Sequence, residues 1–285
     1  KPVRSRNQLV LDFSRKEVVD GIFGQISAVL DNANIEYVKW DMNRSLMDVF
    51  SVMTKDQGRV MYDYVLGLYD FLDRMVKRYP DLLIEGCSGG GGRFDAGMLY
   101  YSPQIWCSDN TDAMNRLDIQ YGTSFFYPIS SVGAHVSACP GRSVPLSTRA
   151  DVALAGSFGY ELDLRLLSDE EKAQVKEQIK EFHDYYDLTH EGDYYRLTER
   201  DNTSFTAWEF VAKNKERALV EVVKKDAWGN PLPVHVTIKG LEDNSMYVCS
   251  LNGIKRSGKT WNHAGITLPK FLSAGESMKF TLTKA

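Results

Sequence analysis

Two stretches of the sequence bring a carboxylate to the end of a run of β-prone residues. Residues 37–44 read YVKWDMNR, so Asp41 ends a short run and has a cation, an indole and an amide as close neighbours. Residues 106–112 read WCSDNTD and place Asp109 in the same kind of position. A buried charge is costly without partners, so such clusters are more typical of sites than of packing. Two acids facing one pocket would suit glycoside hydrolysis.

A purely structural role stays open for these residues, because a strand-end Asp such as Asp41 can also cap the following loop. The run Gly89–Gly92 lacks the Lys-Ser/Thr of a phosphate-binding loop, and we interpret it as a place where the backbone approaches a ligand closely. Cys87 has no His at a helpful spacing, so we expect it to line a pocket and not to act as a nucleophile. His135 is interpreted as a satisfied core residue. Loop and helix-start salt bridges are expected for Arg93, Asp95 and Arg116.

The elements that would position these residues alternate between strand and helix. Strands are expected over 9–13, 35–40, 82–85, 104–107, 133–137 and 160–164, with helices over 18–29, 60–77, 113–121, 147–158 and 168–186. Ser-x-x-Glu capping boxes at 14–17 and 168–171 open two of the helices. The alternation predicts parallel βαβ units, whose active sites lie at the carboxyl ends of the strands.

Past residue 194 the pattern changes to short alternating strands. They are expected over 204–212, 217–224, 234–238, 245–250 and 277–282. Apolar and polar residues alternate along them, which predicts an antiparallel β-sandwich of five or more strands. We therefore predict an α/β domain over 1–193 and a β-sandwich domain over 194–285.

Composition limits the classes of partner. The chain of 285 residues is 43% hydrophobic and carries a net charge of −4, which argues against nucleic acid and anionic membranes. Its four cysteines show no paired spacing, so we expect no zinc site, no cofactor and a cytoplasmic, reducing location. No membrane-length apolar run and no signal peptide is visible. The abrupt start suggests a piece of a longer chain, which makes the missing signal uninformative.

Three motifs resemble those of glycoside hydrolase family 36, the microbial α-galactosidases that act on raffinose-type oligosaccharides. They are KWDMNR at 39–44, CSGGGGRFD at 87–95 and WCSDNTDA at 106–113. The resemblance is dense from Arg6 to about Tyr127 and looser beyond. It implies a (β/α)8 TIM-type barrel followed by a β-domain, and a retaining double displacement at an α-galactoside.

The resemblance also implies roles for single residues. Asp41 would be the nucleophile that forms a covalent galactosyl-enzyme, with Lys39 beside it favouring its ionised form. Asp109 would be the acid and later the base, roughly 5–5.5 Å from the nucleophile. Asp112 is the rival for the acid, and we interpret it as an N-cap or supporting residue. Positions that hold galactose hydroxyls match Arg6, Lys39, Asn43, Cys87 and Gly89, and Trp40 would wall the pocket.

One departure concerns the barrel itself. If Asp41 ends the fourth strand, as in the family, then 9–13 is the third strand, Asp109 ends the sixth, and 160–164 is the eighth. The first two strands and an amino-terminal β-domain are then missing, and the chain resembles the carboxyl-terminal part of such an enzyme. Six strands cannot close the usual barrel, so we expect the chain alone to be weakly active or inactive.

Several alternatives stay open. An α-N-acetylgalactosaminidase or a raffinose-type transglycosylase would share the chemistry, and the pocket near Cys87 and Gly89 decides the first case. A carbohydrate-binding fragment without turnover belongs to another class, and comparing sugar binding with hydrolysis separates it. A metal-dependent hydrolase would be sensitive to chelators. A small α-galactoside is the expected partner, and a homotetramer is implied by the resemblance alone.

Overall fold

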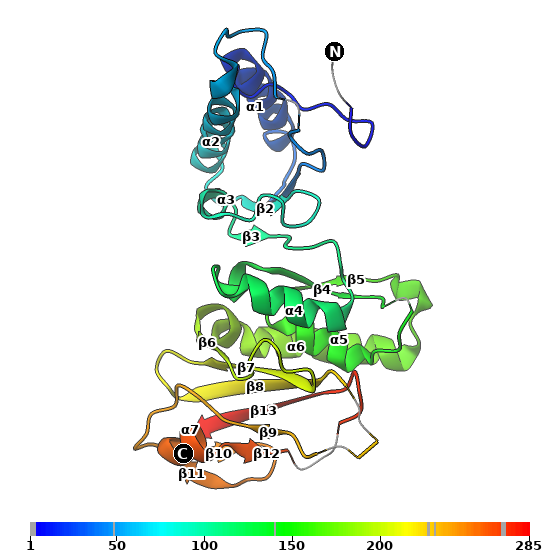
Figure 1. Ribbon diagram of the computed structural model, residues 1–285, viewed down its shortest axis with the longest axis vertical. Coiled ribbons are helices and arrows are strands. Elements are labelled where there is room, and N and C mark those ends of the chain that lie inside the picture. Colours follow the sequence, from blue (N-terminus) through cyan, green and yellow to red (C-terminus); the bar gives the residue numbers. More distant parts are fainter. Residues whose placement is uncertain (1–3, 48, 140, 227–228, 231, 269–271) are drawn as a thin grey trace. The chain divides into compact units, whose positions relative to one another are not determined.

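The computed structural model describes residues 4–47, 49–139, 141–226, 229–230, 232–268 and 272–285. The chain forms two compact units, Lys1–Asp109 and Asn110–Ala285. Figure 1 shows helices and short strands in the first unit, and a helical layer on a larger sheet in the second.

The first unit is built on a parallel sheet in the order β1-β2-β3. Its elements are α1 (Lys16–Leu30), β1 (Tyr37–Asp41), η1 (Gln57–Arg59), α2 (Val60–Arg78), β2 (Leu83–Cys87), α3 (Ala96–Tyr101) and β3 (Gln104–Ile105). In the pairing of β1 with β2, Lys39 is opposite Glu85 and Asp41 is opposite Cys87. The expected βαβ arrangement is therefore present here.

The two faces of this sheet differ in character because side chains alternate along a strand. Trp40 packs toward α2, where its indole stacks on Phe71 with ring centroids 4.8 Å apart. Ile84 and Ile105 join the same apolar cluster. Lys39, Asp41 and Glu85 occupy the opposite phase of β1 and β2. One face thus builds the core with the helices and the other carries the polar groups.

Two expectations near the start of the chain are wrong. Residues 9–13 form no strand, and β1 has a ladder partner on its β2 side alone within the described residues. The capping box at 14–17 does not form: α1 begins after Arg15, which makes no side-chain cap. The reason is local competition, because the Ser14 hydroxyl hydrogen-bonds to the carboxylate of Asp12.

The second unit begins with a parallel strand pair covered by helices. Its elements up to the long helix are α4 (Ala113–Thr123), η2 (Ile129–Ser131), β4 (Gly133–Ser137), α5 (Leu146–Leu154), β5 (Ser157–Glu161), η3 (Leu164–Leu166) and α6 (Asp169–Glu191). Strands β4 and β5 pair in parallel. The capping box of Ser168 and Glu171 is confirmed and opens α6.

Helix α5 ends four residues earlier than expected, and β5 starts three residues earlier. Gly156 explains the break, because a Cβ there would lie 2.4 Å from the carbonyl oxygen of Val132. Ser157 then donates its backbone N–H to the same oxygen at 2.9 Å. The chain therefore leaves the helix and joins β4 at once.

The rest of the second unit is an antiparallel sheet in the order β11-β10-β13-β8-β7-β6 with a separate pair β12-β9. Its elements are β6 (Asp193–Arg196), β7 (Phe205–Val211), β8 (Arg217–Lys224), β9 (His235–Val236), β10 (Met246–Cys249), β11 (Lys255–Ser257), α7 (Gly258–Ala264), β12 (Ile266–Thr267) and β13 (Ser277–Lys284). One face packs in an apolar cluster around Val220 and Trp261. The expected carboxyl-terminal antiparallel strands are confirmed.

None of the helices that the structure describes is long and apolar enough to cross a membrane.

Glu209 makes the stability of the second unit depend on pH. It lies on β7, fully buried, and its Oε2 accepts the backbone N–H of Lys239 at 2.9 Å. Burial raises the pKa of Glu209 to about 8 from an ordinary value of 4.5. The fold thus favours the protonated form, so this group lowers the free energy of unfolding as pH rises from 4.5 through 8.

We expect Glu209→Gln, which keeps an acceptor for Lys239, to remove that pH dependence. Between pH 5 and 8 the variant should lose less unfolding free energy than the parent, by on the order of a few kcal/mol. Urea unfolding at several pH values measures this. The exposed Glu177→Gln on α6 is the control. Parallel pH profiles of Glu209→Gln and the parent would contradict the prediction.

Candidate active site

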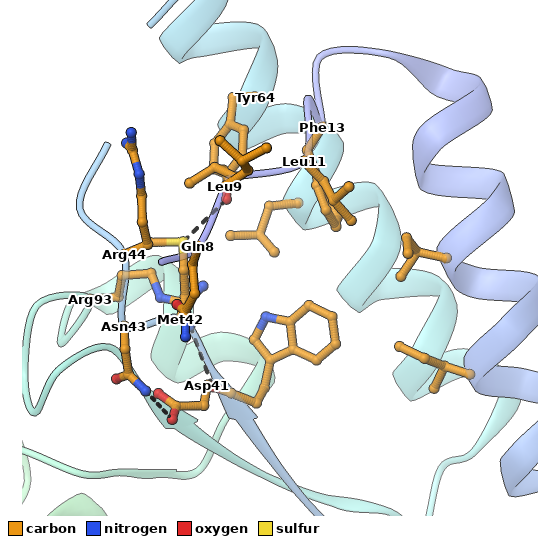
Figure 2. A pocket seen from close by; sticks show the side chains of 15 residues that line it. Gln8, Leu9, Leu11, Phe13, Asp41, Met42, Asn43, Arg44, Tyr64 and Arg93 are labelled. Atoms are coloured by element: carbon orange, nitrogen blue, oxygen red, sulfur yellow. Dashed lines mark hydrogen bonds between the residues drawn. The ribbon is translucent and has the colours of Figure 1, made fainter. Parts of the chain in front are cut away.

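Asp41 ends β1 with an exposed carboxylate that is oriented by Asn43. The Asn43 amide Nδ2 donates to Asp41 Oδ2 at 2.5 Å, and Asn43 Oδ1 accepts the backbone N–H of Gly89 at 2.8 Å. Figure 2 shows the two side chains pointing toward one another. Because the glycine N–H takes the amide oxygen, the amide NH2 group is directed at the carboxylate. Asn43 thus links Asp41 to the loop after β2.

Further bonds join the loops that follow β1 and β2. The Met42 backbone N–H donates to Cys87 O at 3.0 Å, and Ser88 Oγ donates to Met42 O at 2.7 Å. The guanidinium of Arg93 donates to Cys87 O at 2.8 Å and to Trp40 O at 3.4 Å. Burial lowers the pKa of Arg93 from its ordinary value. These bonds fix the backbone on which Asp41 stands.

The salt bridges expected in this region are wrong in part. Arg93 donates to two strand-end carbonyl groups, those of Trp40 and Cys87, instead of forming an ion pair. Asp95 is the N-cap of α3 and accepts the Met98 N–H at 2.9 Å. In the second unit Arg116 is buried, where it donates to Gln120 Oε1 at 3.2 Å and to the carbonyl of Gly133.

Cys87 faces Asp41 across the sheet, directly opposite it in register. Burial raises the pKa of the Cys87 thiol, and its hydrogen bond to Asp41 raises it further. The thiol therefore stays protonated at neutral pH, which is unfavourable for a nucleophile. Cys87 is buried, and its interpretation as a pocket-lining residue stays a prediction.

Asp109 follows β3, and its carboxylate is oriented by the indole of Trp106. Trp106 Nε1 donates to Asp109 Oδ1 at 3.0 Å. Like Asp41, the Asp109 side chain is exposed. The structure therefore places both candidate acids after strands of one parallel sheet, Asp41 after β1 and Asp109 after β3, with β2 between them.

The glycine run lies against this loop, and the expectation that it also approaches a ligand stays a prediction. A Cβ on Gly90 would lie 2.9 Å from Ser108 Cα and 3.0 Å from Asp109 N. A Cβ on Gly91 would lie 2.6 Å from Cys107 O. Gly90 also has a φ of 80°, in the left-handed region. The absence of side chains lets the loop after β2 lie directly against the loop that carries Asp109.

Lys39 has Glu85 as its ion-pair partner, and not Asp41 as expected. Its Nζ lies 3.3 Å from Glu85 Oε1 and 5.3 Å from the centroid of the Trp106 ring. Tyr37 donates its hydroxyl to Glu85 Oε2. Burial raises the pKa of Glu85 to about 7. The sequence reasoning missed Glu85, although its place two residues before Cys87 puts both in the same strand phase.

Two predicted residues lie apart from the Lys39–Glu85 pair. Trp40 is on the helix-facing side of β1, where its indole stacks on Phe71 and lines the cavity that also borders Asp41, in agreement with its predicted place in a pocket wall. Arg6 is exposed in a two-residue turn between Ser5 and Gln8 and has a φ of 53°. Within the described ranges Arg6 makes no hydrogen bond or ion pair with the other candidates.

A cavity of about 470 Å³ borders the site. Its polar end is formed by Asp41, Asn43 and Arg93, and apolar side chains of 9–13, α1 and α2 line the rest. Figure 2 shows Leu9 and Phe13 away from Asp41. The cavity is large enough for a small ligand, but its apolar walls offer few partners for hydroxyl groups. The polar groups that could hold a sugar lie at the Asp41 end.

The second unit holds the remaining candidates. Asp112 is the N-cap of α4, accepting the Asn115 N–H at 3.0 Å, so its interpretation as a cap is confirmed. Arg142 Nε lies 3.1 Å from the same carboxylate. His135 Nδ1 lies 3.3 Å from Glu161 Oε2 on the neighbouring strand. No group of three His, Cys, Asp or Glu residues suited to a metal ion occurs in the described part of the chain.

Comparisons with known proteins agree across the whole chain. The Melibiase family model matches residues 1–192, and the model of the glycosyl hydrolase family 36 C-terminal domain matches 205–282. Bifunctional alpha-galactosidase/sucrose kinase AgaSK of Mediterraneibacter gnavus is 56% identical over 288 residues, covering 100% of the chain and 30% of that protein. Alpha-galactosidase Mel36A of Lactobacillus acidophilus is 49% identical over 253 residues, 87% of the chain and 34% of the relative.

Solved structures give the same picture. A variant of the GH36 alpha-galactosidase AgaA from Geobacillus stearothermophilus in complex with raffinose matches with a TM-score of 0.96 and 44% identity. The match covers 100% of the chain and 40% of that protein. The galactosidase domain of AgaSK matches with a TM-score of 0.94. The chain thus spans less than half the length of these relatives.

Gly90→Ala should destabilise the first unit, because the new Cβ meets the backbone of Ser108 and Asp109 at a left-handed φ. We expect the free energy of unfolding to fall by about 1–3 kcal/mol. Thermal unfolding followed by tryptophan fluorescence measures the loss. Gly24→Ala on α1, where a Cβ meets nothing within 4 Å, should be neutral or slightly stabilising. Equal unfolding midpoints for the two variants would refute the steric argument.

Proposed function

The chain belongs to the melibiase family, glycosyl hydrolase family 36, and on this premise we propose that it carries the two catalytic carboxylates of a retaining α-galactosidase. One observation carries the proposal: Asp41 and Asp109 follow β1 and β3, the two strands that flank β2 in one parallel sheet, and each carboxylate accepts a hydrogen bond from a side-chain N–H group. Strand carboxyl ends are where barrel enzymes place their reacting groups.

In the proposed reaction Asp41 attacks the anomeric carbon of an α-linked galactose. The glycosidic C–O bond breaks, Asp109 gives its proton to the departing oxygen, and a galactosyl ester forms on Asp41. Asp109 then removes a proton from water, the water oxygen attacks the same carbon, and Asp41 leaves. Two inversions retain the configuration. The Asn43 amide supports this role because its donor lies on the carboxylate that must carry negative charge.

We propose raffinose-type oligosaccharides with a terminal α-galactose as substrates. Support comes from the complexes of AgaA variants with raffinose and stachyose. Galactose hydroxyls would be held at the Asp41 end of the site by Lys39, Asn43, Cys87 and Gly89, with Arg6 brought in from its turn. The exposed ammonium of Lys39 and the protonated thiol of Cys87 are suitable hydroxyl partners. No cofactor enters the proposed reaction.

We further infer that the parallel strands are part of a (β/α)8 barrel, and that the antiparallel strands form a β-sandwich. The unpaired edge of β1 beside residues 9–13 supports an incomplete sheet in the part of the chain described. A cytoplasmic homotetramer remains part of the proposal.

Asp41→Asn and Asp109→Asn should each abolish most α-galactosidase activity in the natural protein that carries this chain. Loss of an acid–base group alone lowers rates by roughly 10²–10⁴-fold, and loss of the nucleophile prevents the covalent step. Hydrolysis of p-nitrophenyl α-galactoside gives the rates, and proton NMR of the first-formed sugar tests retention.

Asp112→Asn is the matched control, because Asn also caps helices well and the variant should stay within a few-fold of the parent. A first-formed β-galactose, or full activity of either Asp41→Asn or Asp109→Asn, would rule out the proposed mechanism.

A further inference from the structure

We propose that Glu85 is a positioning residue that holds the Lys39 ammonium where a galactose hydroxyl can meet it. The inference rests on the proposed function and deepens it, since Glu85 itself touches no substrate. A side chain as long as Lys39 can adopt many conformations, and fixing one of them before binding lowers the entropy that binding costs.

The first argument is the strand register. Lys39 and Glu85 are direct partners in the β1–β2 ladder, so their side chains leave the same face of the sheet side by side. The Glu85 side chain is 3% exposed, whereas that of Lys39 is 41% exposed. The Glu85 carboxylate is therefore buried, and the Lys39 side chain beside it extends to the surface.

The second argument is what lies around the amine. Lys39 Nζ has Glu85 Oε1 at 3.3 Å and the face of Trp106 with its centroid at 5.3 Å. Trp106 in turn donates Nε1 to Asp109 Oδ1. Carboxylate and ring restrict the ammonium from two directions and place it above the indole that orients the proposed acid. An ammonium has three donors, so the exposed side retains donors for a ligand.

The third argument is that both carboxylate oxygens of Glu85 have partners. The Tyr37 hydroxyl donates to Oε2, while Lys39 is at Oε1, so each oxygen has its own neighbour. Tyr37 and Lys39, both on β1, contact the Glu85 carboxylate, and the Trp106 ring lies next to the Lys39 ammonium. Gln104 is the ladder partner of Glu85 on β3. A buried carboxylate with this set of partners is more than a packing residue.

Ionisation of Glu85 then affects substrate binding. Burial raises the pKa of Glu85 to about 7. Below that pH the carboxyl group is neutral and attracts Lys39 weakly. Above it the carboxylate holds the ammonium, so KM for an α-galactoside should fall as pH rises through about 7.

Glu85→Gln in the natural protein that carries this chain tests the inference. Removing the ion pair with Lys39 should raise KM for p-nitrophenyl α-galactoside about tenfold. We expect kcat to change less than about threefold, because Lys39 would contact the sugar in both ground and transition states. The KM inflection near pH 7 should disappear. The exposed Glu36→Gln, three residues before Lys39, should leave both constants unchanged.

Two further variants keep the test decisive if Glu85→Gln folds poorly. Tyr37→Phe keeps the carboxylate but removes its hydroxyl donor, so the inflection should move to higher pH. Lys39→Met should raise KM at least as much as Glu85→Gln, and the double variant should be no worse than Lys39→Met alone. Additive effects in this cycle, or an unchanged KM and pH profile in Glu85→Gln and Tyr37→Phe, would overturn the inference.

A separate readout distinguishes this inference from the proposed function. If the parent hydrolyses no α-galactoside, the proposed function fails, while the 15N resonance of the Lys39 ammonium still reports on the pair. It should shift in Glu85→Gln and titrate near pH 7 in the parent. An unshifted resonance would show that Glu85 does not position Lys39.

Discussion

The parallel pairing of β1 with β2 is the constraint on which the candidate site depends. One register places Asp41 opposite Cys87 and Lys39 opposite Glu85, and the same pleat sends Trp40 and Ile84 into the helices. A slip by one residue would exchange the two faces, burying a lysine in the apolar core. The packing of α2 against Trp40 therefore stabilises the sheet and selects the face on which the chemistry can occur.

The loops that follow β1 and β2 need a second constraint, because the hydrogen bonds between the two strands stop where the strands end. Asn43, Ser88 and Arg93 supply the missing partners for backbone groups on both loops. Glycine at 90 and 91 removes the side chains that would separate this assembly from Asp109. Conformational freedom lost by ordering glycines is unfavourable, and here it is offset by direct backbone packing. The positions of Asp41 and Asp109 relative to one another are thus fixed by contacts between backbone segments, which are stiffer than contacts between side chains.

Sequence reasoning located most of the elements and the strand-end positions of Asp41 and Asp109, because those signals are local. Helical periodicity fixed α2 and α6, and strand-end carboxylates stood out at Asp41 and Asp109. It failed where the outcome depends on competition or on distant partners. The Ser14 hydroxyl donates a hydrogen bond to the Asp12 carboxylate instead of capping a helix. Residues 9–13 have a strand-like composition, but in the described part of the chain they pair with no strand.

The pairing of Lys39 with Glu85 shows the same limit more sharply. The two residues are 46 positions apart, and only the register between their strands makes them neighbours. Sequence reasoning gave Glu85 no role, and it assigned Lys39 to Asp41 because that residue was close in sequence. Arg93 likewise has the chemistry of an ion-pair residue but serves carbonyl groups, a choice set by where the strands end.

A lysine on the second unit shows why the position of Lys39 suits a ligand. Lys279 is the ladder partner of buried Glu221, and its ammonium also contacts Asp151 and Glu181, each at 2.7 Å. With acids on α5, α6 and β8 around it, Lys279 is 22% exposed and acts as a structural link. Lys39 has the same cross-strand relation to one buried acid, yet its ion-pair partner in the described part of the chain is that acid alone, at 3.3 Å, and its side chain is 41% exposed. Both lysines face a buried acid across two strands, so the strand pairing does not distinguish them. The number of acceptors around the ammonium does: Lys279 is held by several acids and is structural, whereas Lys39 retains donors that can bind a sugar.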